Sequence, residues 1–135
     1  YRLPSHREWT ILAKCGDERK HPWGNAWPPP SGKAGNYADA AAKTAFPDWQ
    51  VVVGYADGHA VTCDVAESGA NAWGLYGIGG NVWELCHPYP SGTLCGGSWL
   101  SDDPGETSIL YAHVQMGGNG AGEARSVGFR CVLSR

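Results

Sequence analysis

The chain has 135 residues, which suits a single domain with one buried core. Apolar residues make up 42% of it and charged residues 17%, near or below the values of ordinary globular proteins. No apolar run approaches the ~20 residues of a membrane-spanning helix, and no signal peptide is recognisable, so we expect no membrane insertion.

The net charge of −3 conceals an uneven distribution of charge. No lysine or arginine lies between Lys43 and Arg125, whereas nine aspartates and glutamates do. Nucleic-acid affinity comes mostly from cations that neutralise phosphates, so this anionic middle argues against a nucleic-acid partner. It favours bound cations, or ligands with positive charge or many hydrogen-bond donors.

In chain order, the first predicted element is a helix over residues 5–14. Ser5 and Glu8 have the spacing of a capping box, and Gly16 follows as a terminator. Its apolar face would contain Trp9, Leu12 and Ala13.

Residues 24–37 are rich in proline, glycine and serine and predict an irregular loop. Beyond it we expect a short helical turn over residues 39–43, a brief strand over 50–53 and a tight turn over 55–58. A further strand is predicted over residues 108–114.

Three glycine-rich segments, residues 74–86, 95–99 and 127–133, are expected to form the core. Glycine is tolerated inside a fold where backbones approach closely or adopt positive φ. The alternation around residue 83 suits a half-buried antiparallel strand. We expect large rings to cover these backbones, namely Tyr76, Trp83, Trp99 and Phe129.

Five ordered motifs carry a family resemblance: RLPSHREW, HPWGNAWPP, GLYGIGGNVWELC, CGGSW and VGFRCVL. Together they resemble the sulfatase-modifying-factor family, whose members include the formylglycine-generating enzymes. The resemblance implies an α+β, C-type-lectin-like fold with small twisted antiparallel sheets, few short helices and much irregular loop. It implies one domain over residues 1–135, and we expect that domain to lack the N-terminal portion that precedes the RLP motif in the family.

The same motifs also resemble the variable proteins of diversity-generating retroelements. In those proteins the segment between GGSW and GFR is a hypervariable ligand-binding region. That segment lies here between Trp99 and Arg125.

The resemblance also allows a test for enzymatic activity. Formylglycine-generating enzymes resemble one another in a cysteine pair that binds copper and performs the oxidation, and the matching positions here are Ser101 and Glu106. A hydroxyl and a carboxylate cannot hold Cu(I) or run thiol chemistry. We therefore expect no copper and no catalysis. The alternative is an oxidoreductase of the family type, or another metal-dependent enzyme built from Ser101, Asp102, Asp103, Glu106 and His113.

The histidines and cysteines add no further motif. The five histidines are far apart and include no H-E-x-x-H, and the five cysteines include no C-x-x-C. Cys86 and Cys95 are either neighbours across a short connection or buried free thiols.

Calcium is the metal that the resemblance implies. A first structural site would use Asp39 and Asp57 with the carbonyls of Ala40 and His59. A second would use Glu84 with the carbonyls of Gly79, Gly80 and Val82. Loops with carboxylates and free carbonyls supply the oxygens that calcium prefers. The alternative roles are a helix cap for Asp39, a turn for Asp57 and an ion pair with Arg130 for Glu84.

The predicted function is a non-catalytic binding module for an unknown protein or cell-surface ligand. Its residues are expected to face water on loops, where large aromatic rings give contact area at low entropic cost. Location on a phage particle, on a cell surface or in the cytoplasm stays open, as does self-association. The predicted contact residues are Trp99, Leu100, Ser101, Asp103, Glu106, Ser108, Leu110, Tyr111, His113, Gln115 and Asn119.

Overall fold

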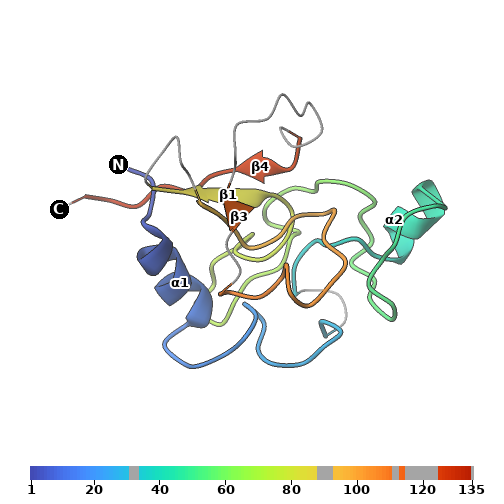
Figure 1. The fold of residues 1–135 in the computed structure, drawn as a ribbon, viewed down its shortest axis with the longest axis horizontal. Coiled ribbons are helices and arrows are strands. Elements are labelled where there is room, and N and C mark those ends of the chain that lie inside the picture. Colours follow the sequence, from blue (N-terminus) through green and yellow to red (C-terminus); the bar gives the residue numbers. More distant parts are fainter. Residues whose placement is uncertain (31–33, 88–92, 111–112, 115–124, 135) are drawn as a thin grey trace.

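The computed structural model describes residues 1–30, 34–87, 93–110, 113–114 and 125–134. Within these residues, two short helices and a small sheet are joined by long irregular segments (Figure 1). The helices are α1 (His6–Lys14) and α2 (Ala40–Ala45), and the strands are β1 (Trp83–Cys86), β2 (Thr93–Cys95), β3 (His113–Val114) and β4 (Val127–Gly128). The α+β class is thus confirmed. Neither described helix is long and apolar enough to cross a membrane.

The first helix begins and ends where the sequence predicts. Ser5 Oγ accepts a hydrogen bond from Glu8 N at 3.2 Å, and Glu8 Oε2 accepts one from Ser5 N at 2.8 Å. The predicted capping box is therefore present. At the other end, Cys15 and Gly16 adopt left-handed backbone conformations, with φ of 53° and 81°, which ends the helix.

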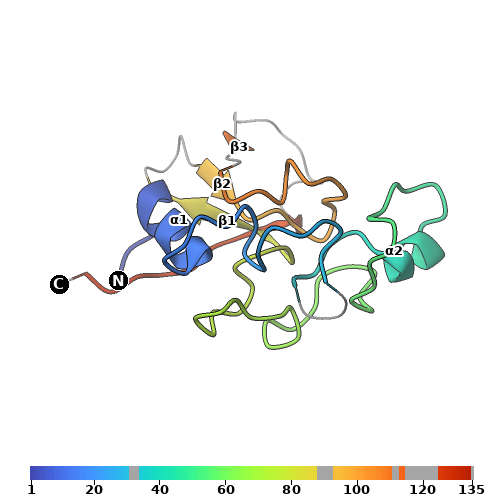
Figure 2. The same ribbon diagram turned by 90° about the horizontal axis from the view of Figure 1, so that it is seen from below.

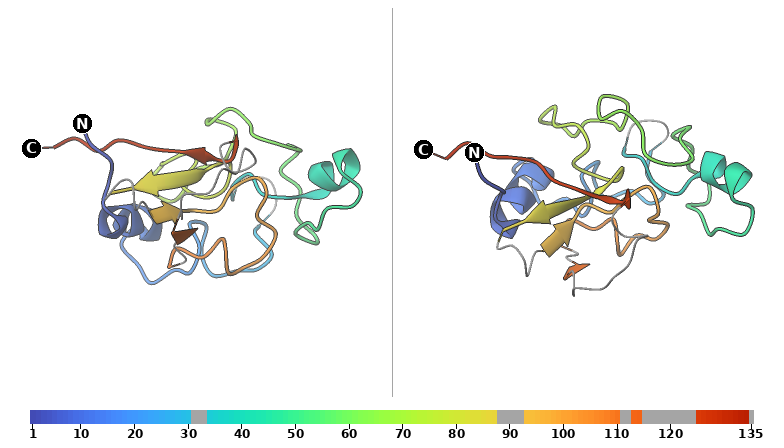
Figure 3. Two further views of the ribbon diagram at one scale, coloured as in Figure 1. Left: turned by 45° about the horizontal axis from the view of Figure 1, so that its top comes forward. Right: turned by 90° about the horizontal axis from the view of Figure 1, so that it is seen from above.

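The sheet has the strand order β3-β2-β1-β4. It is mixed and not antiparallel throughout as expected, because β4 pairs with β1 in parallel. Strand β1 is antiparallel to β2 and parallel to β4, while β2 is antiparallel to β3 (Figure 3). Near the chain ends, Arg2 and Val132 exchange backbone hydrogen bonds of 3.1 and 2.9 Å. The two termini consequently lie together at the α1 end of the molecule, and α2 lies at the opposite end (Figures 1 and 2).

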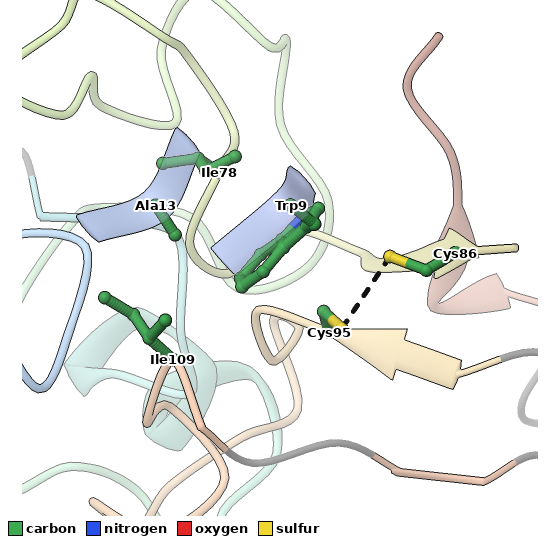
Figure 4. Packing of buried hydrophobic residues seen from close by; sticks show 6 residues of the cluster. All are labelled: Trp9, Ala13, Ile78, Cys86, Cys95 and Ile109. Atoms are coloured by element: carbon green, nitrogen blue, oxygen red, sulfur yellow. Dashed lines mark hydrogen bonds between the residues drawn. The ribbon is translucent and has the colours of Figure 1, made fainter. Parts of the chain in front are cut away.

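The main core lies between α1 and the strands β1 and β2. It consists of six buried residues: Trp9, Ala13, Ile78, Cys86, Cys95 and Ile109. Figure 4 shows these side chains converging from the helix, the two strands and the loops, with the two sulfur atoms 3.8 Å apart. Both cysteines are free thiols, so the structure combines the two alternatives: they are neighbours and they are unbonded.

A second cluster lies toward the α2 half of the chain. It is formed by Tyr37, Val52 and Tyr55, with Trp23 packed against it. The rings that fill the interior are therefore Trp9 and these two tyrosines. This corrects the predicted set of covering rings, because Tyr76 and Phe129 are 49% and 67% exposed, while Trp83 and Trp99 are only partly buried.

Glycines do allow the close backbone approach that the sequence predicts. Gly80 N donates to Gly96 O at 2.8 Å, which joins the GIGG segment to the CGG segment. A Cβ at Gly80 would overlap the backbone of Asn36, and one at Gly96 would touch the Trp9 ring at 3.1 Å. Both glycines also have positive φ, so a larger residue is excluded on two grounds.

Two predicted strands differ from the structure. Residues 50–53 form no strand: Val52 N donates to Ala38 O, but its neighbour Val53 is 87% exposed and pairs with no strand. Of the strand predicted over residues 108–114, only β3 is present among the described residues. Residues 108–110 instead lie in a turn, because Ser108 N donates to Gly105 O and Ser108 Oγ accepts from Leu110 N.

Candidate functional site

A pocket of about 550 Å³ lies beyond the C-terminal end of α2. The two ends of the segment predicted to bind a ligand, Trp99 and Arg125, meet at this pocket. Its described lining residues come from four separate parts of the chain and are Phe46, Trp49, Val61, Thr62, Trp99 and Arg125.

Three aromatic rings form the apolar wall of this pocket. The rings of Phe46 and Trp49 are stacked, with centroids 4.0 Å apart and planes at 19°. Trp49 also faces Trp99, with centroids 5.5 Å apart and planes at 33°. All three residues are only partly buried, so ring surface is left for a ligand.

The end of α2 positions two of these rings. Asp39 caps the helix, whose last turn closes through the bond from Phe46 N to Ala42 O at 2.8 Å. Trp49 N then donates to Phe46 O at 3.0 Å, and Lys43 Nζ donates to Trp49 O at 2.7 Å. The chain therefore turns back directly after the helix and brings the ring of Trp49 onto that of Phe46.

The third ring is held by the GGSW motif. Trp99 N donates to Asn81 O at 3.1 Å, and this bond ties the motif to the GIGGN segment. The indole nitrogen of Trp99 is buried and has no hydrogen-bond acceptor among the described residues. An unpaired buried N–H costs about 1–3 kcal/mol, so the fold holds Trp99 at this position at a cost in stability.

Arg125 contributes the only charge among the described lining residues. Its side chain is exposed, and no described residue forms an ion pair with it. Lys43 is the cation nearest to Phe46 and Trp49 in the sequence, but its ammonium group donates to the Trp49 carbonyl. The pocket thus combines an apolar wall with one unpaired guanidinium.

Ser101 is not on the surface, and the expectation that it faces water is wrong. It is 1% exposed, and its Oγ accepts a hydrogen bond from Ser98 N at 3.1 Å. Its backbone N–H donates to Ser98 O, and its backbone carbonyl accepts a hydrogen bond from Ala38 N. A hydroxyl held in this way stabilises the turn after the GGSW motif. Glu106, at the second position of the family's cysteine pair, is partly buried.

The other predicted contact residues are divided between surface and scaffold. Leu100 and Leu110 are 41% and 71% exposed, and Asp103 is exposed although its Oδ1 accepts from Gly105 N and Glu106 N. Ser108 is partly buried. Residues Tyr111, Gln115 and Asn119 and the side chain of His113 lie outside what the structure describes.

Sequence reasoning missed Phe46, Trp49, Val61 and Thr62 as site residues. The one available signal was the FPDW tetrapeptide, in which two rings flank a proline and an aspartate shortly after a predicted helical turn. Nothing in the sequence indicated that these rings meet Trp99.

At the first predicted calcium site, backbone amides donate hydrogen bonds to both carboxylates. Asp39 accepts four N–H bonds of 2.7–3.0 Å, from Ala41 and Ala42 at the start of α2 and from Asp57 and Gly58. Asp57 accepts from Tyr37 N and His59 N, both at 2.9 Å. Burial raises the pKa of Asp57 to about 6. The alternative roles of helix cap and turn are therefore present.

At the second predicted site, Glu84 is engaged in an ion pair. It is 6% exposed and accepts two bonds of 2.6 Å from Arg130, at Oε1 and Oε2, and a third of 2.6 Å from Trp9 Nε1. The described residues include no group of three or more histidine, cysteine, aspartate or glutamate side chains that could hold a metal. Calcium binding at either site stays a prediction.

Comparison with known proteins identifies the family. The sequence pattern of the sulfatase-modifying factor enzyme 1-like domain matches residues 1–135. A formylglycine-generating enzyme from Thermomonospora curvata is 31% identical over 125 residues, which is 92% of this chain and 36% of that protein. A second from Streptomyces coelicolor is 31% identical over 119 residues, 87% of this chain and 35% of that protein. The chain spans about a third of the length of these relatives. It belongs to the sulfatase-modifying factor enzyme 1-like domain family.

Proposed function

We propose that this domain is a non-catalytic ligand-binding module whose site is the aromatic pocket between Trp99 and Arg125. The observation that carries the proposal is the convergence of the two ends of the predicted binding segment on one cavity, beside Phe46 and Trp49. A cavity of about 550 Å³ lies within the range of pockets that take small ligands, roughly 300–1,000 Å³.

The residues at the positions of the family's cysteine pair support binding over oxidation. Ser101 has a hydroxyl where the resemblance places a copper-binding thiol, and that hydroxyl is buried and bonded to Ser98 N. Copper(I) prefers soft thiolate or thioether ligands, which neither Ser101 nor Glu106 supplies.

A second candidate is the oxidation of a peptide cysteine, favoured by the two relatives that are named as formylglycine-generating enzymes. For this activity the chain would need another thiol near the pocket. No cysteine is among the described residues that line it.

Three finer proposals come from the resemblance. The first is a C-type-lectin-like fold, the second is structural calcium, and the third is that the segment between Trp99 and Arg125 is varied by a retroelement. A near-repeat of the Trp99–Arg130 coding segment beside a reverse-transcriptase gene, differing mainly at adenines, would support the third. A genome in which that segment has no such repeat would remove it.

The experiment has two arms on the purified domain. In the first, a cysteine-containing peptide is incubated with the domain, copper and oxygen, and the peptide aldehyde is sought by mass spectrometry. In the second, the neutral planar probe 2-naphthamide is titrated by calorimetry into the wild-type domain and the Trp99→Ala variant. We expect no aldehyde, and saturable binding that Trp99→Ala weakens at least tenfold. Aldehyde formation, or probe binding unchanged in Trp99→Ala, would overturn the proposal.

A further inference from the structure

We propose that the pocket formed by Trp49, Trp99 and Arg125 selects ligands that carry a carboxylate on a planar apolar ring. The inference rests on the proposed function, because it names the class of ligand for that same pocket. Two features of the lining carry it: the arrangement of the rings and the unpaired guanidinium.

The arrangement of the rings favours a flat ligand. Phe46, Trp49 and Trp99 form a continuous series in which each ring contacts the next at 4.0 and 5.5 Å between centroids. Such pairs prefer offset-stacked or tilted contacts, and an aromatic ring of a ligand would extend the series through the same kind of contact. A bulky branched ligand would leave the ring faces partly uncovered.

The guanidinium favours an anion on that ligand. Arg2, Arg19 and Arg130 each form a salt bridge with a carboxylate of this chain at 2.6–2.7 Å. Arg125 lines the pocket with no such partner among the described residues. A planar guanidinium matches a carboxylate with two parallel hydrogen bonds, so an anionic ligand would supply the kind of partner that Arg2, Arg19 and Arg130 find within the fold.

This local charge differs from that of the middle of the chain as a whole. The nine acidic residues between Lys43 and Arg125 favour cationic ligands in general. Among the described residues that line the pocket, however, there is one arginine and no carboxylate. Of those acidic residues, Asp48 stands directly before Trp49 in the sequence and is exposed, but it is not among the described lining residues, whereas Arg125 is.

The test compares two probes of nearly equal shape, 2-naphthoate and 2-naphthamide, by calorimetry at neutral pH and about 0.1 M salt, where exposed charges more than about 10 Å away are largely screened. The variants are Arg125→Gln and, as a control with the same change of charge, Arg7→Gln on the exposed face of α1. We expect the wild-type domain and Arg7→Gln to bind the carboxylate at least tenfold more tightly than the amide. In Arg125→Gln the two probes should bind equally, at the affinity that the amide has for the wild type.

The outcomes separate this inference from the proposed function. Equal binding of both probes by the wild type, with loss of both in Trp99→Ala, would overturn the charge preference and leave the pocket as a binding site. A preference for the carboxylate that Arg125→Gln retains would also overturn it. Binding of neither probe would overturn the inference and the proposed site together. Circular dichroism of each variant shows whether it is folded before its affinity is compared.

Discussion

The two ends of the molecule use tryptophan in opposite ways. At the α1 end, Trp9 is fully buried and its indole nitrogen donates to Glu84, which is itself paired with Arg130. At the α2 end, Trp99 lines an open pocket and its indole nitrogen has no acceptor among the described residues. The comparison indicates that the first end contributes to stability, and the proposed function assigns binding to the second.

Glu84 and Arg130 explain why the α1 end can bury polar groups at a low cost in free energy. A carboxylate that accepts three hydrogen bonds satisfies the indole and the guanidinium at once. The α2 end has no such carboxylate among its described lining residues, so the exposed guanidinium of Arg125 remains available to a ligand.

The largest effect on the comparison is expected from Trp9→Ala. It removes a large ring from a closed core and should lower the free energy of unfolding by about 3–5 kcal/mol. Urea denaturation measures the loss. As the matched control, Trp73→Ala removes a ring that is 51% exposed and should cost far less. Equal losses in the two variants would contradict the assignment of Trp9 to the core.

The next largest effect is expected from Glu84→Gln. The variant leaves Arg130 without its carboxylate in a mostly buried position, where loss of one partner of an ion pair costs about 3–5 kcal/mol. We expect a loss near the lower limit of that range, because glutamine retains an acceptor oxygen. The control is Glu8→Gln, at the capping box of α1. If Glu8→Gln lowers the free energy of unfolding more than Glu84→Gln does, the ion pair of Glu84 and Arg130 does not have this role in stability.

A smaller effect is expected when each indole nitrogen is removed while most of the ring is kept. Trp9→Phe takes a donor from Glu84, whereas Trp99→Phe removes an N–H that has no described acceptor. Trp9→Phe should therefore cost about 1–2 kcal/mol more than Trp99→Phe in the free energy of unfolding. If Trp99→Phe is the more destabilising variant, Trp99 has a structural partner and the comparison fails.

The last effect concerns the pH dependence of stability at the α2 end. Burial raises the pKa of Asp57 from about 3.8 to about 6, so between these values the folded chain holds a proton that the unfolded chain has released. The free energy of unfolding should therefore fall as the pH rises from about 4 to about 6. Urea denaturation of the wild type and Asp57→Asn across this range isolates the contribution, because other carboxyl groups cancel in the difference. If the free energy of unfolding of the wild type minus that of Asp57→Asn is independent of pH, or increases with pH, the raised pKa of Asp57 is contradicted.

Local patterns in the sequence predicted the parts of the fold that depend on neighbours. The capping box of Ser5 and Glu8 sets the start of α1, and the glycines of the GIGG and CGG segments allow their backbones to meet. The pairing of Glu84 with Arg130 was one of two alternatives, and it is present.

The candidate site could be predicted only in part, because its geometry depends on contacts between distant residues. Trp99 and Arg125 were named as the ends of the binding segment, but Phe46 and Trp49 lie about fifty residues earlier and join them only through the fold. The burial of Ser101 also follows from a non-local contact, the bond from Ala38 N to its carbonyl. A polar residue beside exposed loop residues gives no sign of that bond in the sequence.

The most direct test of the account follows the seven tryptophan indole signals in a ¹⁵N-resolved NMR spectrum during titration with 2-naphthoate. The signals of Trp9 and Trp99 are assigned by their loss in Trp9→Phe and Trp99→Phe. We predict that the Trp99 signal shifts to a saturating end point while the Trp9 signal stays in place. A Trp99 signal that does not move at saturating probe, or equal shifts of both signals, would contradict the claim that the binding site lies at the α2 end.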